Sequence, residues 1–136
     1  MLSRRLREKA REETGASSLE LLVFFPLLLL IILVTVQVAL SWYGNEVAMT
    51  TAREAARTLR TGAHDDAALA AARADGAAYA QSLAGSGLTD VVVEASVDGG
   101  AVTVTVTGSA MDVFRGLTPR VRATVTSPIE EFRGNS

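Results

Sequence analysis

The distribution of charged, apolar and mixed segments divides the chain into regions with different expected structures. A charged leader ends at Gly15, and an uncharged apolar run extends from Leu21 to Leu40. Twenty residues of α-helix span about 30 Å, which is the thickness of the hydrocarbon core of a bilayer. The run therefore predicts a helix that crosses a membrane once.

Beyond the run, polarity rises while helix-forming residues persist. The helix is expected to continue as a stalk to about Arg60 and to stop near Gly62. Small or apolar residues recur along this stalk at spacings of three and four: Ala48, Ala52, Ala55 and Leu59. This alanine stripe predicts close packing on another element. Three arginines form a second stripe, which we interpret as a solvated face: Arg53, Arg57 and Arg60.

A second helix is predicted to begin after a cap at Asp65 or Asp66 and to run to about Ala84, where Gly85 ends it. An apolar seam follows its length at spacings of three and four: Leu69, Ala72, Gly76, Tyr79 and Leu83. This seam is expected to lie on a sheet or on the stalk. The one histidine, His64, has no companion ligand or nucleophile and is expected in a solvent-facing loop.

The last third of the chain has the two-residue period of β-strands. Apolar residues alternate with other residues over 91–97, and valine alternates with threonine over 102–107. A two-residue turn at Asp98–Gly99 would place Ala95 opposite Val102 and put Val91, Val93 and Val97 with their partners on one apolar face. The sequence therefore predicts a tight hairpin.

A third strand is predicted from Arg120 to Thr126, with Val121, Ala123 and Val125 pointing inward and Pro128 ending it. Apolar residues of the preceding connection are expected to cover the open end of the core: Met111, Val113, Phe114 and Leu117.

These elements predict an α+β fold. Its parts are a long N-terminal membrane-spanning helix that continues as a stalk, a second helix and a small three-stranded antiparallel sheet. The expected division is a cytoplasmic leader over 1–15, the transmembrane helix and stalk over 16–62, and a small extracytoplasmic α/β domain over 63–136.

Charge next to the apolar run predicts how the chain is oriented. The leader carries five basic residues, whereas residues 41–51 carry a single charge, Glu46. Basic residues are retained on the cytoplasmic side of a membrane. The N-terminus is therefore expected inside and the C-terminal part outside. Trp42 and Tyr43 follow the run directly and are expected at headgroup level, at the outer membrane interface.

Composition excludes several classes of function. The chain has 136 residues, and about 95 of them lie beyond the membrane run, which is enough for one small domain. It has no cysteine, so neither disulfides nor a thiolate metal site are expected, and a net charge of −2 does not favour nucleic-acid binding. No spaced set of nucleophile, base and acid is present. We therefore expect no enzyme, cofactor, metal site or small-molecule substrate.

Glu20 lies alone at the start of the apolar run, and two interpretations of it stay open. Ser17 and Glu20 have the S-x-x-E spacing of a capping box, in which both side chains satisfy amides of a first helical turn. Alternatively, a carboxylate at the membrane edge pairs with a positive group, because an unpaired one costs about 3 kcal/mol in the bilayer. A new α-amino group, made by cleavage after Gly15, would be such a partner.

The segment Gly15-Ala16-Ser17-Ser18-Leu19-Glu20, between a basic leader and an apolar helix, resembles the type III signal of type IV pilin-like proteins. Three further details make the chain similar to the TadE-like minor pseudopilins of the tight-adherence (Flp) pilus system: Pro26 within the run, the polar Thr35 and Gln37, and the segment 51–57. The resemblance covers roughly residues 11–62. Leu21 departs from it, because major pilins of this system usually carry an aromatic residue after the glutamate.

The resemblance implies a function in pilus assembly or initiation. A prepilin peptidase would cleave after Gly15, and Glu20 would pair with the new amine of Ala16 in its own chain or a neighbour's. It also implies a bacterial cytoplasmic membrane, with the lipid bilayer, other pilin-like subunits and membrane platform proteins as partners. Pro26 is expected to kink the helix, since it removes one backbone donor.

Two other interpretations remain. The chain could stay uncut as a single-pass anchored adaptor that binds an envelope partner through its sheet or stalk. It could instead be released by cleavage after Ser41, although the apolar run is longer than that of a secretory signal peptide.

Overall fold

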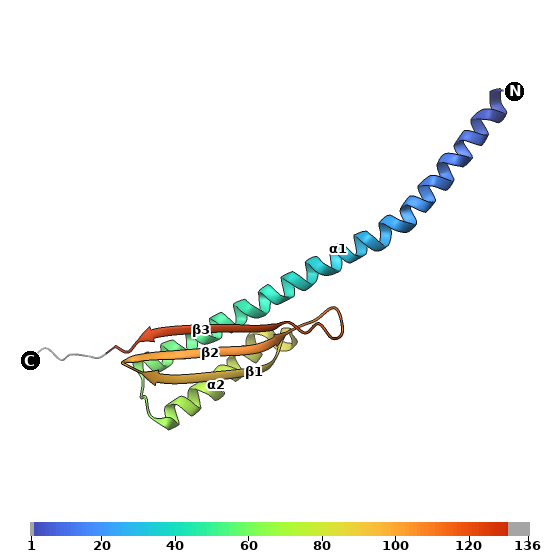
Figure 1. The fold of residues 1–136 in the computed structure, drawn as a ribbon. Helices are drawn as coiled ribbons and strands as arrows, with labels where there is room; N and C mark the ends of the chain where they lie inside the picture. The colour runs from blue at the N-terminus through green and yellow to red at the C-terminus, as the bar shows by residue number, and fades with distance from the viewer. Residues whose placement is uncertain (1, 131–136) are drawn as a thin grey trace, which may run out of the picture. The chain divides into compact units, whose positions relative to one another are not determined.

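The structure is a computed structural model that describes residues 2–130 (Figure 1). Its helices are α1 (Leu2–Thr61), α2 (Asp66–Ala84) and the short 3-10 helix η1 (Gly85–Gly87). Its strands are β1 (Leu88–Asp98), β2 (Ala101–Ala110) and β3 (Arg120–Pro128). The predicted α+β fold is confirmed, with one long apolar helix, a second helix and a three-stranded antiparallel sheet. The domain boundaries at residues 15 and 62 stay a prediction.

The chain divides after Val36 into two compact units. The first holds the N-terminal part of α1, where nearly all large apolar side chains from Leu19 onward are exposed; Leu22, for example, is 73% exposed. Within Ser17–Thr61, an 18-residue window has a mean hydropathy of 2.9 and none of it is buried. Length and apolar composition thus make this helix suited to a membrane span, and no other described helix meets the same criteria.

The second unit, from Gln37 onward, is a sheet with helices on its apolar face. The sheet has the strand order β1-β2-β3 with antiparallel pairs throughout. The valines of β2, Val102, Val104 and Val106, are completely buried. Threonines cover the other face, where the hydroxyl of Thr103 meets that of Thr126 at 3.2 Å. One face therefore packs on the helices and the other meets solvent, as is usual for antiparallel sheets.

The hairpin is tight, but its turn lies one residue later than predicted. Asp98 pairs with Ala101, so the two-residue loop is Gly99-Gly100 and Val97 pairs with Val102. Both glycines have positive φ, 57° and 78°, which the favoured two-residue hairpin turn requires at both positions. Glycine adopts such angles at little cost, whereas Asp98 would be strained in that place. The correction moves each pairing by two residues, so the predicted apolar face is preserved.

The connection from β2 to β3 also differs from the prediction. Met111 is 41% exposed, Val113 37% and Leu117 67%, so these residues do not cover the core. The core is instead closed at this end by Leu88 and Ala110, which are almost fully buried. β3 itself was predicted correctly as an inward-facing strand, with Val121 and Ala123 buried.

The predicted ends of α2 are confirmed. Asp65 is the N-cap, and its Oδ1 accepts a hydrogen bond of 2.8 Å from the Ala68 amide; Gly85 caps the C-terminus with a φ of 54°. His64 is exposed, as expected. The predicted seam was partly wrong, because the buried residues are Ala72, Gly76 and Ala80, whereas Tyr79 and Leu83 are exposed. Small residues are buried here because α2 lies very close to the sheet.

Candidate functional site

Glu20 lies in the middle of a continuous helix, four residues after Ala16. Residues four apart lie on the same helical face, with Cβ atoms about 6 Å apart. The Glu20 side chain is exposed, and Leu19, Val23 and Phe24 line a shallow apolar hollow beside it. No residue in the described part of the chain forms an ion pair with Glu20. The backbones of Gly15 and Ala16 belong to α1, and their side chains lie outside the described residues.

The capping box predicted at Ser17 and Glu20 is contradicted for the uncut chain. α1 begins at Leu2, so residues 17–20 lie more than three turns inside it. The amides of an interior turn already bond to carbonyls four residues earlier, and there is no orphan donor for either side chain to satisfy. A helix terminus could arise here only if the chain were cut.

Pro26 lies inside α1, which continues on both sides of it. The proline still lacks a backbone donor, so the carbonyl of Leu22 has no amide partner four residues later. The kink itself stays a prediction. Large apolar side chains surround this turn on the helix surface, including Leu22 and Phe25.

The two aromatic residues after the apolar run lie in different surroundings. Trp42 is 69% exposed, with its ring on the helix surface. The hydroxyl of Tyr43 donates a hydrogen bond of 3.2 Å to the carbonyl of Leu83 at the end of α2. Gly87 lies against the Tyr43 ring, so that a Cβ on this glycine would be 3.1 Å from Cε1. Tyr43 thus holds α2 against α1, and its role at a membrane interface stays a prediction.

Gln37 is a contact residue whose partner the sequence did not reveal. Its Nε2 donates to the carbonyl of Met111 at 3.3 Å, and its Oε1 accepts from the amide of Val113 at 2.8 Å. The side chain of Gln37 thus binds two backbone groups of the β2–β3 connection, the carbonyl of Met111 and the amide of Val113. A lone glutamine in an apolar run was the available signal, because such a polar group needs a partner.

The alanine stripe of α1 is buried, as predicted. Ala48 and Ala52 are completely buried, and Ala55 and Leu59 nearly so. The same face extends to Gly44, which sequence reasoning missed: a Cβ there would lie 3.0 Å from the Cβ of Ala110. Gly44 precedes Ala48 by four residues, so it continues the stripe toward the membrane run.

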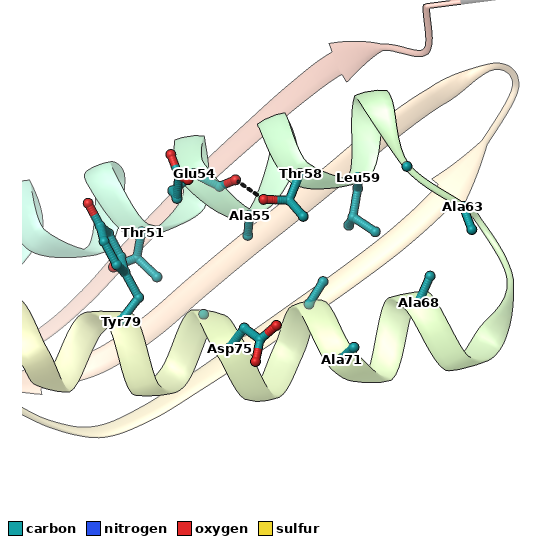
Figure 2. A pocket seen from close by; sticks show the side chains of 13 residues that line it. Thr51, Glu54, Ala55, Thr58, Leu59, Ala63, Ala68, Ala71, Asp75 and Tyr79 are labelled. Carbon is teal, nitrogen blue, oxygen red and sulfur yellow. Dashed lines mark hydrogen bonds between the residues drawn. The ribbon is translucent and has the colours of Figure 1, made fainter.

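A groove of about 360 Å³ lies between α1 and α2 (Figure 2). Its walls are mostly small apolar side chains, among them Ala55, Ala68 and Ala71. Thr51 lines it with a buried Oγ1 that has no hydrogen-bond partner in the described structure. The groove contains the carboxylates of Glu54 and Asp75, but no nucleophile with a neighbouring base, so its geometry does not indicate catalysis.

The arginine stripe has two described contacts. Arg57 forms a weak, exposed pair with Glu54 at 3.9 Å, and Arg60 forms an ion pair with Glu130 beyond β3. Exposed pairs of this kind contribute about 0 to 1 kcal/mol. Arg73 of α2, outside the stripe, donates to the carbonyl of Ala95 at 2.9 Å and so ties α2 to β1.

The described residues contain no cluster of histidine, aspartate or glutamate side chains that could hold a metal ion. The described residues instead offer three structural features: an exposed apolar helix, a lone carboxylate within it, and a helix face of small residues packed on a sheet. The exposed apolar helix is suited to membrane insertion.

Comparison with known proteins identifies one family. The model of the TadE-like proteins matches residues 15–57, which extend from the glycine before the membrane run through most of the alanine stripe. The resemblance predicted from the sequence is therefore confirmed over this segment. No curated protein and no solved structure matches the chain. The match indicates a membrane protein associated with a tight-adherence pilus, and the exposed apolar helix indicates a single-pass anchor.

Proposed function

We propose, from a family match that covers the membrane run and the stalk, that this protein is a minor pseudopilin. It acts in the assembly or initiation of a tight-adherence pilus. A prepilin peptidase cleaves it after Gly15, and residues 21–40 then hold it in the bacterial cytoplasmic membrane with the folded unit outside. Its partners are the bilayer, the peptidase, other pilin-like subunits and membrane platform proteins.

The observation that carries this proposal is the position of Glu20. It is an exposed carboxylate on an apolar helix and has no ion-pair partner among the described residues. Within a bilayer such a group is costly, which favours a pairing that the described side chains do not provide. In the cut chain, the new ammonium of Ala16 would lie about one helical turn from Glu20, on the same face.

Cleavage would also create a helix N-terminus where none exists in the uncut chain. The free amides of a first turn carry partial positive charge, which favours a carboxylate nearby. Processing would therefore change Glu20 from an interior helix residue into one stabilised by both the ammonium and the helix terminus. The same ammonium could serve the glutamate of a neighbouring subunit, which would link subunits within the membrane.

Packing completes the mechanism. The exposed leucines, isoleucines and valines of the first unit can exchange lipid for the helices of other subunits at little cost, since both surroundings are apolar. The folded unit keeps its own core and offers its exposed faces to partners. Chemistry on a bound substrate has no part in this function.

Substitution of Glu20 by glutamine tests the proposal. Glu20→Gln keeps the size of the side chain and removes the charge. We expect leader removal at the normal rate and loss of pilus assembly in the host, because the variant has no carboxylate to pair with an ammonium. Immunoblotting of membranes measures cleavage, and sheared surface fractions measure pilus assembly.

Glu46→Gln is the matched control. Glu46 is an exposed acid on the same helix, in the second unit. It should assemble pili like the parent protein. If Glu20→Gln also assembles normally, the carboxylate has no role in assembly, and an uncut anchored adaptor becomes the better explanation of the fold.

A further inference from the structure

The β2–β3 connection, residues 111–119, is attached to Gln37, near the end of the apolar run. Gln37 lies three residues before Leu40, the last residue of the run, and holds the carbonyl of Met111 and the amide of Val113. A rise of 1.5 Å per residue places Gln37 about 4.5 Å inside the end of the run. If residues 21–40 span the bilayer, the connection begins at the depth where hydrocarbon meets the headgroups.

Backbone groups at such a depth must find partners within the protein. Several backbone groups of the connection have such partners. Besides the two groups held by Gln37, the carbonyl of Pro119 accepts a hydrogen bond of 2.9 Å from the Ala110 amide, and the Met111 amide donates one of 3.3 Å to the carbonyl of Gly87. A turn closed by a bond of 3.1 Å from the Leu117 amide to the Phe114 carbonyl forms the tip.

Several side chains of the connection are apolar and face outward, whereas the carboxylate of Asp112 accepts a hydrogen bond of 3.2 Å from the Thr118 hydroxyl. Met111, Val113 and Leu117 are all exposed, and Phe114 is partly so. Such a cluster on a short loop is unfavourable in water, because its apolar surface stays hydrated and the free energy of moving it out of water is not gained. Arg115 lies between Phe114 and Leu117, and a guanidinium in this place can bind lipid phosphates bidentately.

We propose that residues 111–117 form a second membrane contact, which inserts into the leaflet on the side of the folded unit. Met111, Val113 and Leu117 enter the boundary between headgroups and acyl chains, and Arg115 binds phosphate groups. Lipid is the occupant because Gln37, which holds this surface, belongs to the last turn of the apolar run. A partner protein would have to displace lipid that already surrounds residues 37–40.

The contact gives the folded unit a fixed position on the membrane. Trp42 lies five residues after Gln37, about 7.5 Å farther along the axis and about 140° around it. The exposed indole and the connection therefore contact the same leaflet from different sides of α1. A helix with one anchor can rotate and tilt, whereas two anchors on different sides restrict both motions.

Single labels measure this contact, because the chain has no cysteine of its own. Leu117→Cys carries a fluorescent label in the full chain, in nanodiscs of phosphatidylethanolamine and phosphatidylglycerol. Quenching by lipids with a nitroxide on the upper acyl chain is compared with quenching by aqueous iodide. We expect the lipid nitroxide to quench the label at residue 117 several-fold more strongly than a label at Ser96→Cys, an exposed position near the C-terminal end of β1.

A label at Leu30→Cys, in the middle of the apolar run, reports whether the helix spans the bilayer at all. It is measured with lipids that carry the nitroxide near the end of the acyl chain, because this position lies at the centre of a spanned bilayer. If the Leu30 label is quenched by lipid but the Leu117 label behaves like the one at Ser96, the second contact does not exist. If the Leu117 label avoids both quenchers only in discs with two copies, a second chain covers the connection and the lipid assignment is wrong. An unquenched Leu30 label would remove the membrane span on which the proposal depends. None of these results decides whether the leader is cleaved.

Discussion

The membrane run and the stalk are parts of one helix with opposite surfaces. Around Leu22 and Leu30 the helix carries large aliphatic side chains, nearly all of them exposed. From Gly44 to Ala55 one face carries small residues that are buried against the sheet and α2. A helix in lipid gains from bulky side chains on every side, while a helix on a sheet gains from close approach. The difference shows that the surroundings of each part of the helix, lipid or sheet, determine the size of its side chains, and that helix propensity does not.

Enlarging a residue of the alanine stripe should break this arrangement most strongly. Ala52 is completely buried, so Ala52→Leu has no room for its three extra carbons. We expect the free energy of unfolding of the second unit to fall by about 3 kcal/mol. Urea unfolding in detergent, followed by hydrogen exchange of the β2 amides, measures the loss.

The reverse change in the membrane run is its control. Leu30→Ala removes a side chain that is about half exposed and does not belong to the buried core. The unfolding of the second unit should not change. A loss similar to that of Ala52→Leu would mean that the run contributes to folding of that unit, and the contrast between the two parts of α1 would be wrong.

The boundary between the two parts depends on Gln37. Gln37→Leu suits the apolar run but removes both hydrogen bonds to the connection, at a local cost of about 2 kcal/mol. Exchange of the Val113 amide should accelerate, while the β2 amides keep their protection. Unchanged exchange at Val113 would show that Gln37 does not hold the connection.

Thr51 offers a smaller effect of opposite sign. Its Oγ1 is buried and has no described partner, so it loses its hydration without a replacement. Thr51→Val keeps the shape and removes the hydroxyl, and stability should rise by about 1 kcal/mol. Thermal unfolding of the two proteins side by side provides the measurement. A destabilised variant would mean that the hydroxyl has a partner in solution.

Periodicity in the sequence was sufficient to predict the elements and the buried face of each strand. It predicted α2 with both caps, because Asp65 and Gly85 carry their signals locally. It missed the position of the hairpin turn, since Asp98-Gly99 and Gly99-Gly100 are both acceptable loops and only the packed sheet selects one. It also misplaced Met111 and Leu117, because an apolar residue in a loop does not indicate whether core or membrane covers it.

Of the candidate site, the sequence supplied Glu20 and its spacing from Ala16, and the long helix removed the capping alternative. The contacts of Gln37 could not be predicted, since its partners are 74 and 76 residues away in the chain. Long-range contacts of single polar residues follow from the fold and leave no periodic pattern.

The first residue of the protein recovered from native host membranes shows whether the leader is removed. Intact mass and N-terminal sequencing identify it without any substitution. We expect Ala16, the residue that places a free ammonium one turn from Glu20. A chain that still begins with Met1 would contradict processing and support an uncut anchor, and one that begins with Trp42 would contradict both.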